Sequence, residues 1–143
     1  MSFTAALLLG ALTLAACGES SQDKALADVC AARKAISEEV TKLQGTTVSS
    51  STVDQAKRGL ESIGDELRKI REAQPDLAPA RREAVQAATS RFGDELKAVG
   101  VQVASGLSSG TGEAAFETAK PKLESALHAL ASDYRQALGP VNC

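Results

Sequence analysis

Residues 53–70 read VDQAKRGLESIGDELRKI and carry an apolar residue at alternating steps of three and four. That spacing follows one face of an α-helix and differs from the strict alternation of a half-buried strand. An apolar seam of this period suits helices that pack nearly parallel, crossing at about 20°. The seam consists of Val53, Ala56, Leu60, Ile63, Leu67 and Ile70. The stretch therefore predicts an all-α fold of packed amphipathic helices.

Three further stretches repeat this pattern. The first stripe, within residues 24–44, consists of Val29, Ala32, Ile36, Val40 and Leu43. The third consists of Val85, Ala88, Phe92, Leu96, Val99, Val103 and Leu107. The fourth consists of Phe116, Ala119, Leu123, Leu127, Leu130, Tyr134 and Leu138. Four helices with short connections favour an up-down-up-down four-helix bundle, which we expect over residues 24–143 as one helical domain.

Turn and capping residues mark where the first three helices start and stop. Gly45 ends the first helix, and Thr52 followed by Gln55 matches the capping-box pattern for the second. Asp76 is placed to cap the third helix. Pro79 is acceptable in the first turn of that helix, because first-turn amides have no partner within the helix.

Glycine and proline residues within and after the predicted helices affect their packing and their boundaries. Gly59 and Gly64 lie inside the second helix, where they permit close approach of a neighbouring helix or are merely tolerated. Pro121 lies inside the fourth stripe, so we expect a kink there or a helix that starts only at about that point. Gly139 and Pro140 stop the fourth helix.

Composition excludes one class of partner. The 143 residues include no Trp, one Tyr and three Phe, and the formal net charge is −2. The charges of both signs are interspersed along the chain, and no basic patch with interleaved aromatic residues occurs. Nucleic acid is therefore not an expected partner.

The N-terminus has the features of an export signal. Residues 3–16 carry no charge, and this run is shorter than the roughly 20 apolar residues that span a bilayer. An apolar run of this length followed by small residues fits a signal peptide. The alternative is a buried apolar helix with a cysteine in the core.

The run ends in Leu14-Ala15-Ala16-Cys17, followed by Gly18. This sequence resembles the lipobox of bacterial prolipoproteins. The resemblance implies that Cys17 receives a diacylglycerol and becomes the mature N-terminus. It divides the chain into a signal peptide (1–16), a polar tether (17–23) and the bundle. We therefore expect an exported protein anchored in the membrane by its lipid. The anchor would lie on the outer face of the cytoplasmic membrane or, as Gly18 favours where two membranes exist, at the outer membrane.

Two more cysteines lie near the ends of the bundle domain. Cys30 is close to the start of the first helix, and Cys143 follows the last apolar position of the fourth. An up-down-up-down bundle brings these two points to the same end, and an exported chain is in an oxidising setting. A disulfide between Cys30 and Cys143 is therefore expected. The alternative is two free or intermolecular thiols.

Candidate catalytic and metal-binding residues are few. His128 is the only histidine, and its helical neighbour Glu124 makes a solvated surface pair the favoured interpretation. The serines 105, 108 and 109 lack the surroundings of a nucleophile. Neither a catalytic site nor a metal or cofactor site is predicted.

The remaining charged motifs are expected to lie on solvated faces. Three carboxylate pairs recur along the chain, Glu38-Glu39, Asp65-Glu66 and Asp94-Glu95, without the Glu-x-x-His motifs of a di-metal bundle. We expect Glu38 to pair with Lys42, and Asp65 with Lys69, one helical turn later. Arg81-Arg82 and Lys57-Arg58 are the one candidate for a basic patch that contacts anionic lipid or an acidic partner.

These features favour a non-enzymatic envelope lipoprotein whose bundle is a binding or interaction module. Its partner would be an envelope protein, a cell-wall polymer or a small apolar ligand between helices. A cavity in the bundle core would favour the ligand, whereas a solid core favours surface recognition. The alternative is a structural or stress-related envelope spacer, which is expected to expose a large apolar stripe on one helix.

Overall fold

The structure is a computed structural model that describes residues 20–47, 49, 52–139 and 143. Within these residues the chain is all-α, without a strand, which confirms the predicted four-helix class. The elements are α1 (Ser21–Gly45), α2 (Val53–Ala73), the short 3-10 helix η1 (Gln74–Asp76), α3 (Pro79–Ser108) and α4 (Gly112–Leu138). The predicted signal peptide and Cys17 lie outside the described residues.

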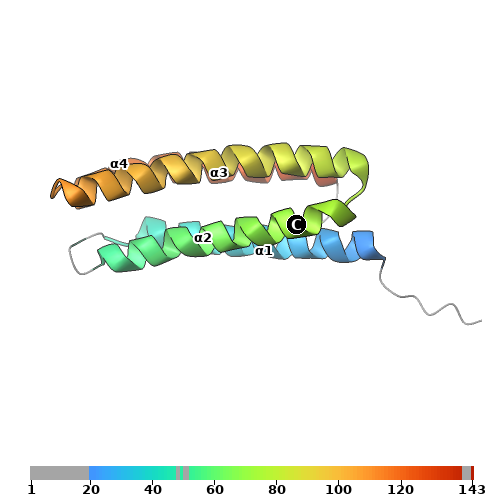
Figure 1. Ribbon diagram of the computed structural model, residues 1–143, viewed down its shortest axis with the longest axis horizontal. Coiled ribbons are helices and arrows are strands. Elements are labelled where there is room, and N and C mark those ends of the chain that lie inside the picture. The colour runs from blue at the N-terminus through green and yellow to red at the C-terminus, as the bar shows by residue number, and fades with distance from the viewer. Residues whose placement is uncertain (1–19, 48, 50–51, 140–142) are drawn as a thin grey trace, which may run out of the picture.

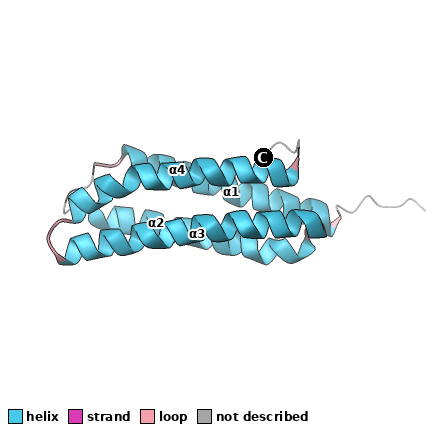
Figure 2. Cartoon of the chain, turned by 90° about the horizontal axis from the view of Figure 1, so that it is seen from above, coloured by secondary structure: helices cyan, strands magenta, loops and turns pink. Residues whose placement is uncertain are grey.

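The helices form two hairpins, α1 with α2 and α3 with α4, stacked as two layers (Figure 1). Viewed at right angles, all four helices run along the same long axis (Figure 2). Gly59, near the start of α2, packs on Leu43 near the end of α1. Gln102, late in α3, donates to the carbonyl of Ala115, early in α4, over 3.3 Å. Neighbouring helices in each hairpin are therefore antiparallel, as the colours of Figure 1 also show.

One apolar core fills the space between the four helices. Every residue of the four predicted stripes faces it, either fully buried or half-buried against it. The largest fully buried side chains include Tyr134, Phe116, Ile36, Ile63 and Ile70. Full burial of each aliphatic side chain contributes roughly 1.5–3 kcal/mol, so the stripes supply the main driving force for folding.

The first helix begins three residues earlier than expected. Ser20 caps α1, because its hydroxyl accepts the backbone N–H of Asp23 over 3.1 Å. Residues 21–23, which the sequence assigns to the tether, form the first turn of the helix. The polar residues of this segment cap and begin the helix. The bundle therefore starts closer to Cys17 than predicted.

Thr52 occupies the N-cap position of α2, as predicted, but the predicted capping box with Gln55 is wrong because the Thr52 side chain makes no capping hydrogen bond. Thr52 has helical dihedral angles, φ −109° and ψ −3°, whereas an N-cap side chain needs an extended backbone to reach back over the first turn. Its hydroxyl instead accepts the N–H of Ser49 over 2.7 Å and donates to the carbonyl of Thr47 over 2.9 Å. Thr52 therefore stabilises the connection between α1 and α2.

The predicted cap of the third helix at Asp76 is also wrong. Asp76 ends η1, and the N-cap position of α3 is Ala78, which has no capping side chain. Pro79 is the first residue of α3, as expected. The turn is held by Arg82, whose guanidinium donates to the carbonyls of Pro75 over 2.7 Å and Leu77 over 3.1 Å. Arg82 therefore stabilises the turn before α3, and the first turn of α3 has no side-chain cap.

Pro121 does not delay the fourth helix. α4 begins at Gly112 and continues through Pro121 to Leu138, so the predicted late start is wrong. The contacts that the first turns make with α3 outweigh the loss of one backbone hydrogen bond at the proline. α4 ends at Gly139, whose φ of +71° is accessible to glycine at little cost.

The two glycines of α2 differ. A Cβ on Gly59 would lie 2.7 Å from Leu43 Cδ2, so this glycine allows α1 to approach closely. A Cβ on Gly64 would have no neighbour within 4 Å, so this glycine is merely tolerated. The approach at Gly106 in α3 is tighter than that at Gly59, because a Cβ there would overlap that of Ala115 in α4.

Candidate functional site

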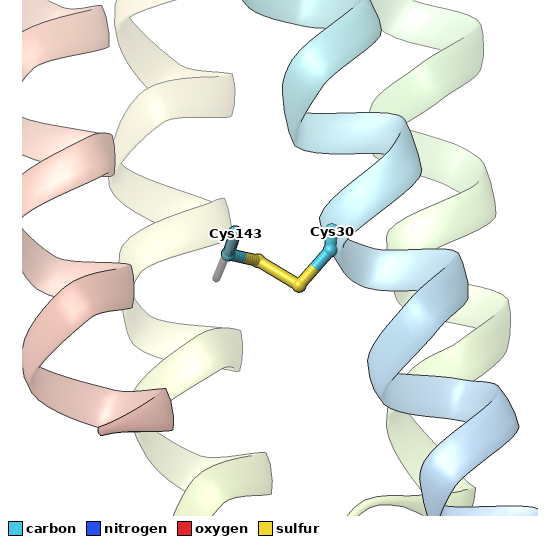
Figure 3. Close-up of a disulfide and its surroundings, with 2 residues drawn as sticks. All are labelled: Cys30 and Cys143. Atoms are coloured by element: carbon cyan, nitrogen blue, oxygen red, sulfur yellow. A yellow bond between two sulfur atoms is a disulfide. The ribbon is translucent and has the colours of Figure 1, made fainter. Parts of the chain in front are cut away.

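The disulfide joins Cys30 to Cys143, with the two Cα atoms 5.0 Å apart (Figure 3). Cys30 lies in α1 and is half-buried against the core, and Cys143 lies 113 residues later. The bond connects the first hairpin to the chain that follows the second hairpin. It is therefore a covalent link between the layers, more than two turns from the end of the bundle where α1 begins.

The same end is the one closest to the predicted lipid site. Cys17 lies outside the described residues, and only Gly18, Glu19 and Ser20 separate it from α1. The connection of α2 to α3 through η1 lies at this end, whereas the end of α1, the start of α2 and the connection 109–111 lie at the other (Figure 1).

A groove of about 720 Å³ runs along the outside of the α3–α4 hairpin. Buried side chains of Ala88, Phe92 and Leu130 contribute to its apolar floor. Arg91 of α3 crosses it to Asp133 of α4, with Nη2 3.0 Å from Oδ2. The groove is within the volume range of small-molecule sites, although it is an open surface feature between helices.

A second groove of about 720 Å³ lies on the α1–α2 hairpin. Its floor is formed by alanines of both helices: Ala25, Ala31, Ala32, Ala35 and Ala73. Its rim carries four carboxylates, Asp28, Glu66, Glu72 and Asp76, and two lysines, Lys24 and Lys69. Both grooves lie between the two helices of one hairpin.

A buried polar pair lies between α3 and α4. Thr89 and Tyr134 are each 1% exposed, and their hydroxyl oxygens are 2.6 Å apart. Because Thr89 donates its single hydrogen to the carbonyl of Val85, also over 2.6 Å, the Tyr134 hydroxyl is the donor of the pair. Burial raises the pKa of Tyr134 to about 12, and the hydrogen bond with Thr89 and the nearby Arg33 guanidinium partly oppose this rise.

The sequence analysis missed the Thr89–Tyr134 pair, although a signal was present. Thr89 lies one turn after Val85, on the inward face of the third stripe, where a polar side chain needs a partner. A second missed feature is Lys120, which donates to the carbonyl of Thr46 over 2.7 Å. Gln44 in turn donates to the carbonyl of Lys120 over 2.8 Å, so α1 and α4 are also linked at the end opposite the disulfide.

The candidate chemical groups are dispersed. His128 is 78% exposed, with Nε2 3.8 Å from the carboxylate of Glu124, which agrees with the predicted surface pair. Ser108 and Ser109 donate to backbone carbonyls at the end of α3. Within the described residues, no group of three or more His, Cys, Asp or Glu side chains could hold a metal ion.

The predicted charge pairs are shifted by one residue. Lys42 pairs with Glu39 over 2.9 Å instead of Glu38. Asp65 pairs with Arg68 over 2.7 Å, while Lys69 pairs with Glu66. These pairs are three residues apart, a spacing that also brings side chains together on a helix surface. Because α2 and α3 are antiparallel, Lys57-Arg58 and Arg81-Arg82 lie near opposite ends of the bundle and form no single basic patch.

Among the described residues, the helices are too short or too polar for any of them to cross a membrane. The sequence matches no protein-family model, no curated protein and no solved structure. The functional interpretation therefore rests on the geometry of the bundle and on the sequence motifs.

Proposed function

We propose that this protein is an exported lipoprotein, held at a membrane by a lipid on Cys17, whose helical bundle is a non-enzymatic interaction module. Its partner, an envelope protein or cell-wall polymer, is recognised through the surface of the bundle. The observation that carries this proposal is the disulfide between Cys30 and Cys143. Disulfides persist in oxidising compartments, so this bond supports export independently of the lipobox resemblance.

The surface of the bundle supports recognition in preference to a spacer role. The spacer alternative expects a large exposed apolar stripe on one helix. Among the described residues, Val101 is the single large apolar side chain that is exposed, at 63%, so these residues form no such stripe. The two grooves are open surface features with charged rims, which suits contact with a polar macromolecular partner.

The proposal is tested by the intact mass of the protein purified from membranes of its own host, measured with and without reductant. We expect a chain that starts at Cys17 and carries a lipid-sized mass increment. Reduction should add two hydrogens, because one disulfide opens. A Cys17→Ala variant is the matched control and should lose the lipid mass and leave the membrane fraction. An unmodified full-length chain in the soluble fraction would overturn the proposal.

A further inference from the structure

We propose that the bundle stands upright on the membrane, and that one of its ends contacts the phosphate groups of the lipids. This end, here called the anchor-side end, comprises residues 21–25 of α1, η1, residues 79–82 of α3 and residues 135–138 of α4. The inference rests on the proposed lipid anchor. In this orientation the anchor-side end faces the bilayer, and the rest of the bundle surface remains available to a partner.

The segment between the proposed lipid and the bundle is short. Four Cα–Cα steps lead from Cys17 to Ser21, the first residue of α1, and span at most about 14 Å. The helices have 21 to 30 residues, and α3, the longest, extends over about 45 Å at 1.5 Å per residue. The lipid therefore holds one end of an elongated body close to the headgroups (Figures 1 and 2).

The anchor-side end carries cations that are available to bind phosphate. Lys24, Arg81 and Arg135 come from three different helices, are exposed, and form no ion pair with a described residue. The guanidinium of arginine matches phosphate oxygens with two parallel hydrogen bonds. Arg82 is excluded from this role because its guanidinium is bound to the carbonyls of Pro75 and Leu77.

The distribution of arginine along the bundle supports the same orientation. Most arginines lie in the halves of α2, α3 and α4 next to the anchor-side end: Arg68, Arg71, Arg81, Arg82, Arg91 and Arg135. Most lysines lie in the opposite halves of the helices: Lys34, Lys42, Lys57, Lys97, Lys120 and Lys122. Residues 45–53 and 98–112, which include both connections at the opposite end, contain no charged residue.

The anchor-side end is suited to a shallow contact with the membrane. Val101 lies in the half of α3 away from the anchor-side end, so no exposed large apolar side chain in the described part of that end is available to enter hydrocarbon. Asp23 and Asp76 belong to the same end, lie among the cations and keep the net charge small. The contact is therefore short-ranged, at the level of the phosphates, and depends on individual arginine hydrogen bonds.

The absence of tryptophan from the sequence allows a direct test. The lipidated full-length protein is inserted into phosphatidylcholine–phosphatidylglycerol vesicles that contain a lipid with a nitroxide on its headgroup. Two variants each carry a single fluorescent probe: Ala80→Trp in the first turn of α3, and Ala114→Trp in the first turn of α4 at the opposite end. Both positions are exposed in the wild type, so neither substitution disturbs the core.

We expect strong quenching of the Ala80→Trp variant and none of the Ala114→Trp variant. Equal quenching of both would mean that the bundle lies flat, and quenching of neither would mean that it floats free of the surface; either result overturns the inference while the anchor stands. The intact mass of the same samples shows whether the lipid is present. A chain without lipid overturns the proposed function and this inference with it.

The arginine contacts are tested by charge reversal in the Ala80→Trp background. Arg81→Glu with Arg135→Glu should reduce the quenching roughly twofold or more, since each basic residue near an anionic surface adds attraction. Lys57→Glu with Arg58→Glu is the matched control at the opposite end and should leave the quenching unchanged. Equal effects of the two double variants would overturn the role of the arginines.

Discussion

The two hairpins hold their helices together in different ways. In the α3–α4 hairpin, polar side chains connect the helices along their length: Thr89 with Tyr134, Arg91 with Asp133, and Gln102 with both Lys122 and the backbone of Ala115. Among the described residues, no hydrogen bond or ion pair joins α1 to α2. That hairpin is held by apolar packing, with Gly59 allowing the contact to Leu43.

This difference bears on how the layers stay together. The contacts between the hairpins are sparser than those within each hairpin. The covalent link of Cys30 to Cys143 lies where α1 meets the end of the second hairpin, and Lys120 with Gln44 connects α1 to α4 at the other end. The two hairpins are thus linked along the α1–α4 contact, by the disulfide in one half of the bundle and by hydrogen bonds in the other.

Removal of the disulfide has the largest expected effect, because this bond acts on both hairpins. The double variant Cys30→Ala with Cys143→Ala should lower the free energy of unfolding by about 4 to 5 kcal/mol, the chain-entropy value for a loop of this length. Urea unfolding followed by circular dichroism measures it. Reductant should destabilise the wild type similarly and leave the double variant unaffected; a reduced wild type with an unchanged midpoint would contradict the prediction.

The burial of Tyr134 between α3 and α4 predicts a loss of stability at alkaline pH. The pKa of Tyr134 is raised from 10.0 to about 12 by burial. The unfolded chain therefore releases this proton first, so stability is full below pH 10 and falls as the pH rises from 10 to 12. A shift of this size corresponds to about 2 to 3 kcal/mol at the upper limit.

This prediction can be followed directly because Tyr134 is the one tyrosine of the chain and tryptophan is absent. The ultraviolet absorbance of tyrosinate should appear near pH 12 in the folded protein and near pH 10 in urea. The Tyr134→Phe variant should lose less stability than the wild type between pH 9.5 and 11.5. Coincident titrations in the folded and urea-unfolded protein would refute it.

Alanine substitutions at three glycines compare the packing of the hairpins. Gly106→Ala should destabilise by roughly 1 to 3 kcal/mol, because the new methyl group meets Ala115 and the backbone of Thr111 and Gly112. Gly59→Ala should change stability by less than about 1 kcal/mol, since the gain in helix propensity offsets the displacement of Leu43, whose side-chain end can rotate.

Gly64→Ala is the control for propensity alone, because nothing lies within 4 Å of the added methyl group. It should stabilise the protein by about 0.5 to 1 kcal/mol. Thermal and urea unfolding of the three variants measure the series. If Gly59→Ala cost as much as Gly106→Ala, the two hairpins would be packed equally tightly and the comparison between them would fail.

The sequence predicts the apolar part of this structure better than the polar part. The stripes of Ile63, Phe92 and Leu123 follow from helical periodicity alone, because burial needs only a consistent face. Residue type correctly predicts the position of Thr52 at the start of α2 but not that of Asp76, and it predicts neither capping hydrogen bond, because a cap depends on backbone dihedral angles that the sequence does not reveal. The same limit explains the shifted charge pairs on the helix surfaces, where alternative pairings differ little in energy.

The disulfide was within reach of the sequence, because the helix count and directions place both cysteines at one end. The Thr89–Tyr134 pair was not, since it joins residues 45 positions apart and depends on how α3 and α4 are aligned along their axes. The grooves also could not be predicted, because their floors combine small residues of two helices, such as Ala88 with Ala129. Pairing between helices, unlike the face of one helix, is a property of the assembled bundle.

The smallest expected effect belongs to the ion pair of Arg91 and Asp133, which spans the α3–α4 groove. The side chains are 68% and 27% exposed, so water and salt screen the attraction. A double-mutant cycle with Arg91→Ala and Asp133→Ala should give a coupling energy of about 0.2 to 1 kcal/mol that decreases in high salt. A coupling well above this range would make the pair a principal support of the hairpin. No coupling would leave the buried Thr89–Tyr134 bond as the polar contact that distinguishes this half of the α3–α4 hairpin from α1–α2.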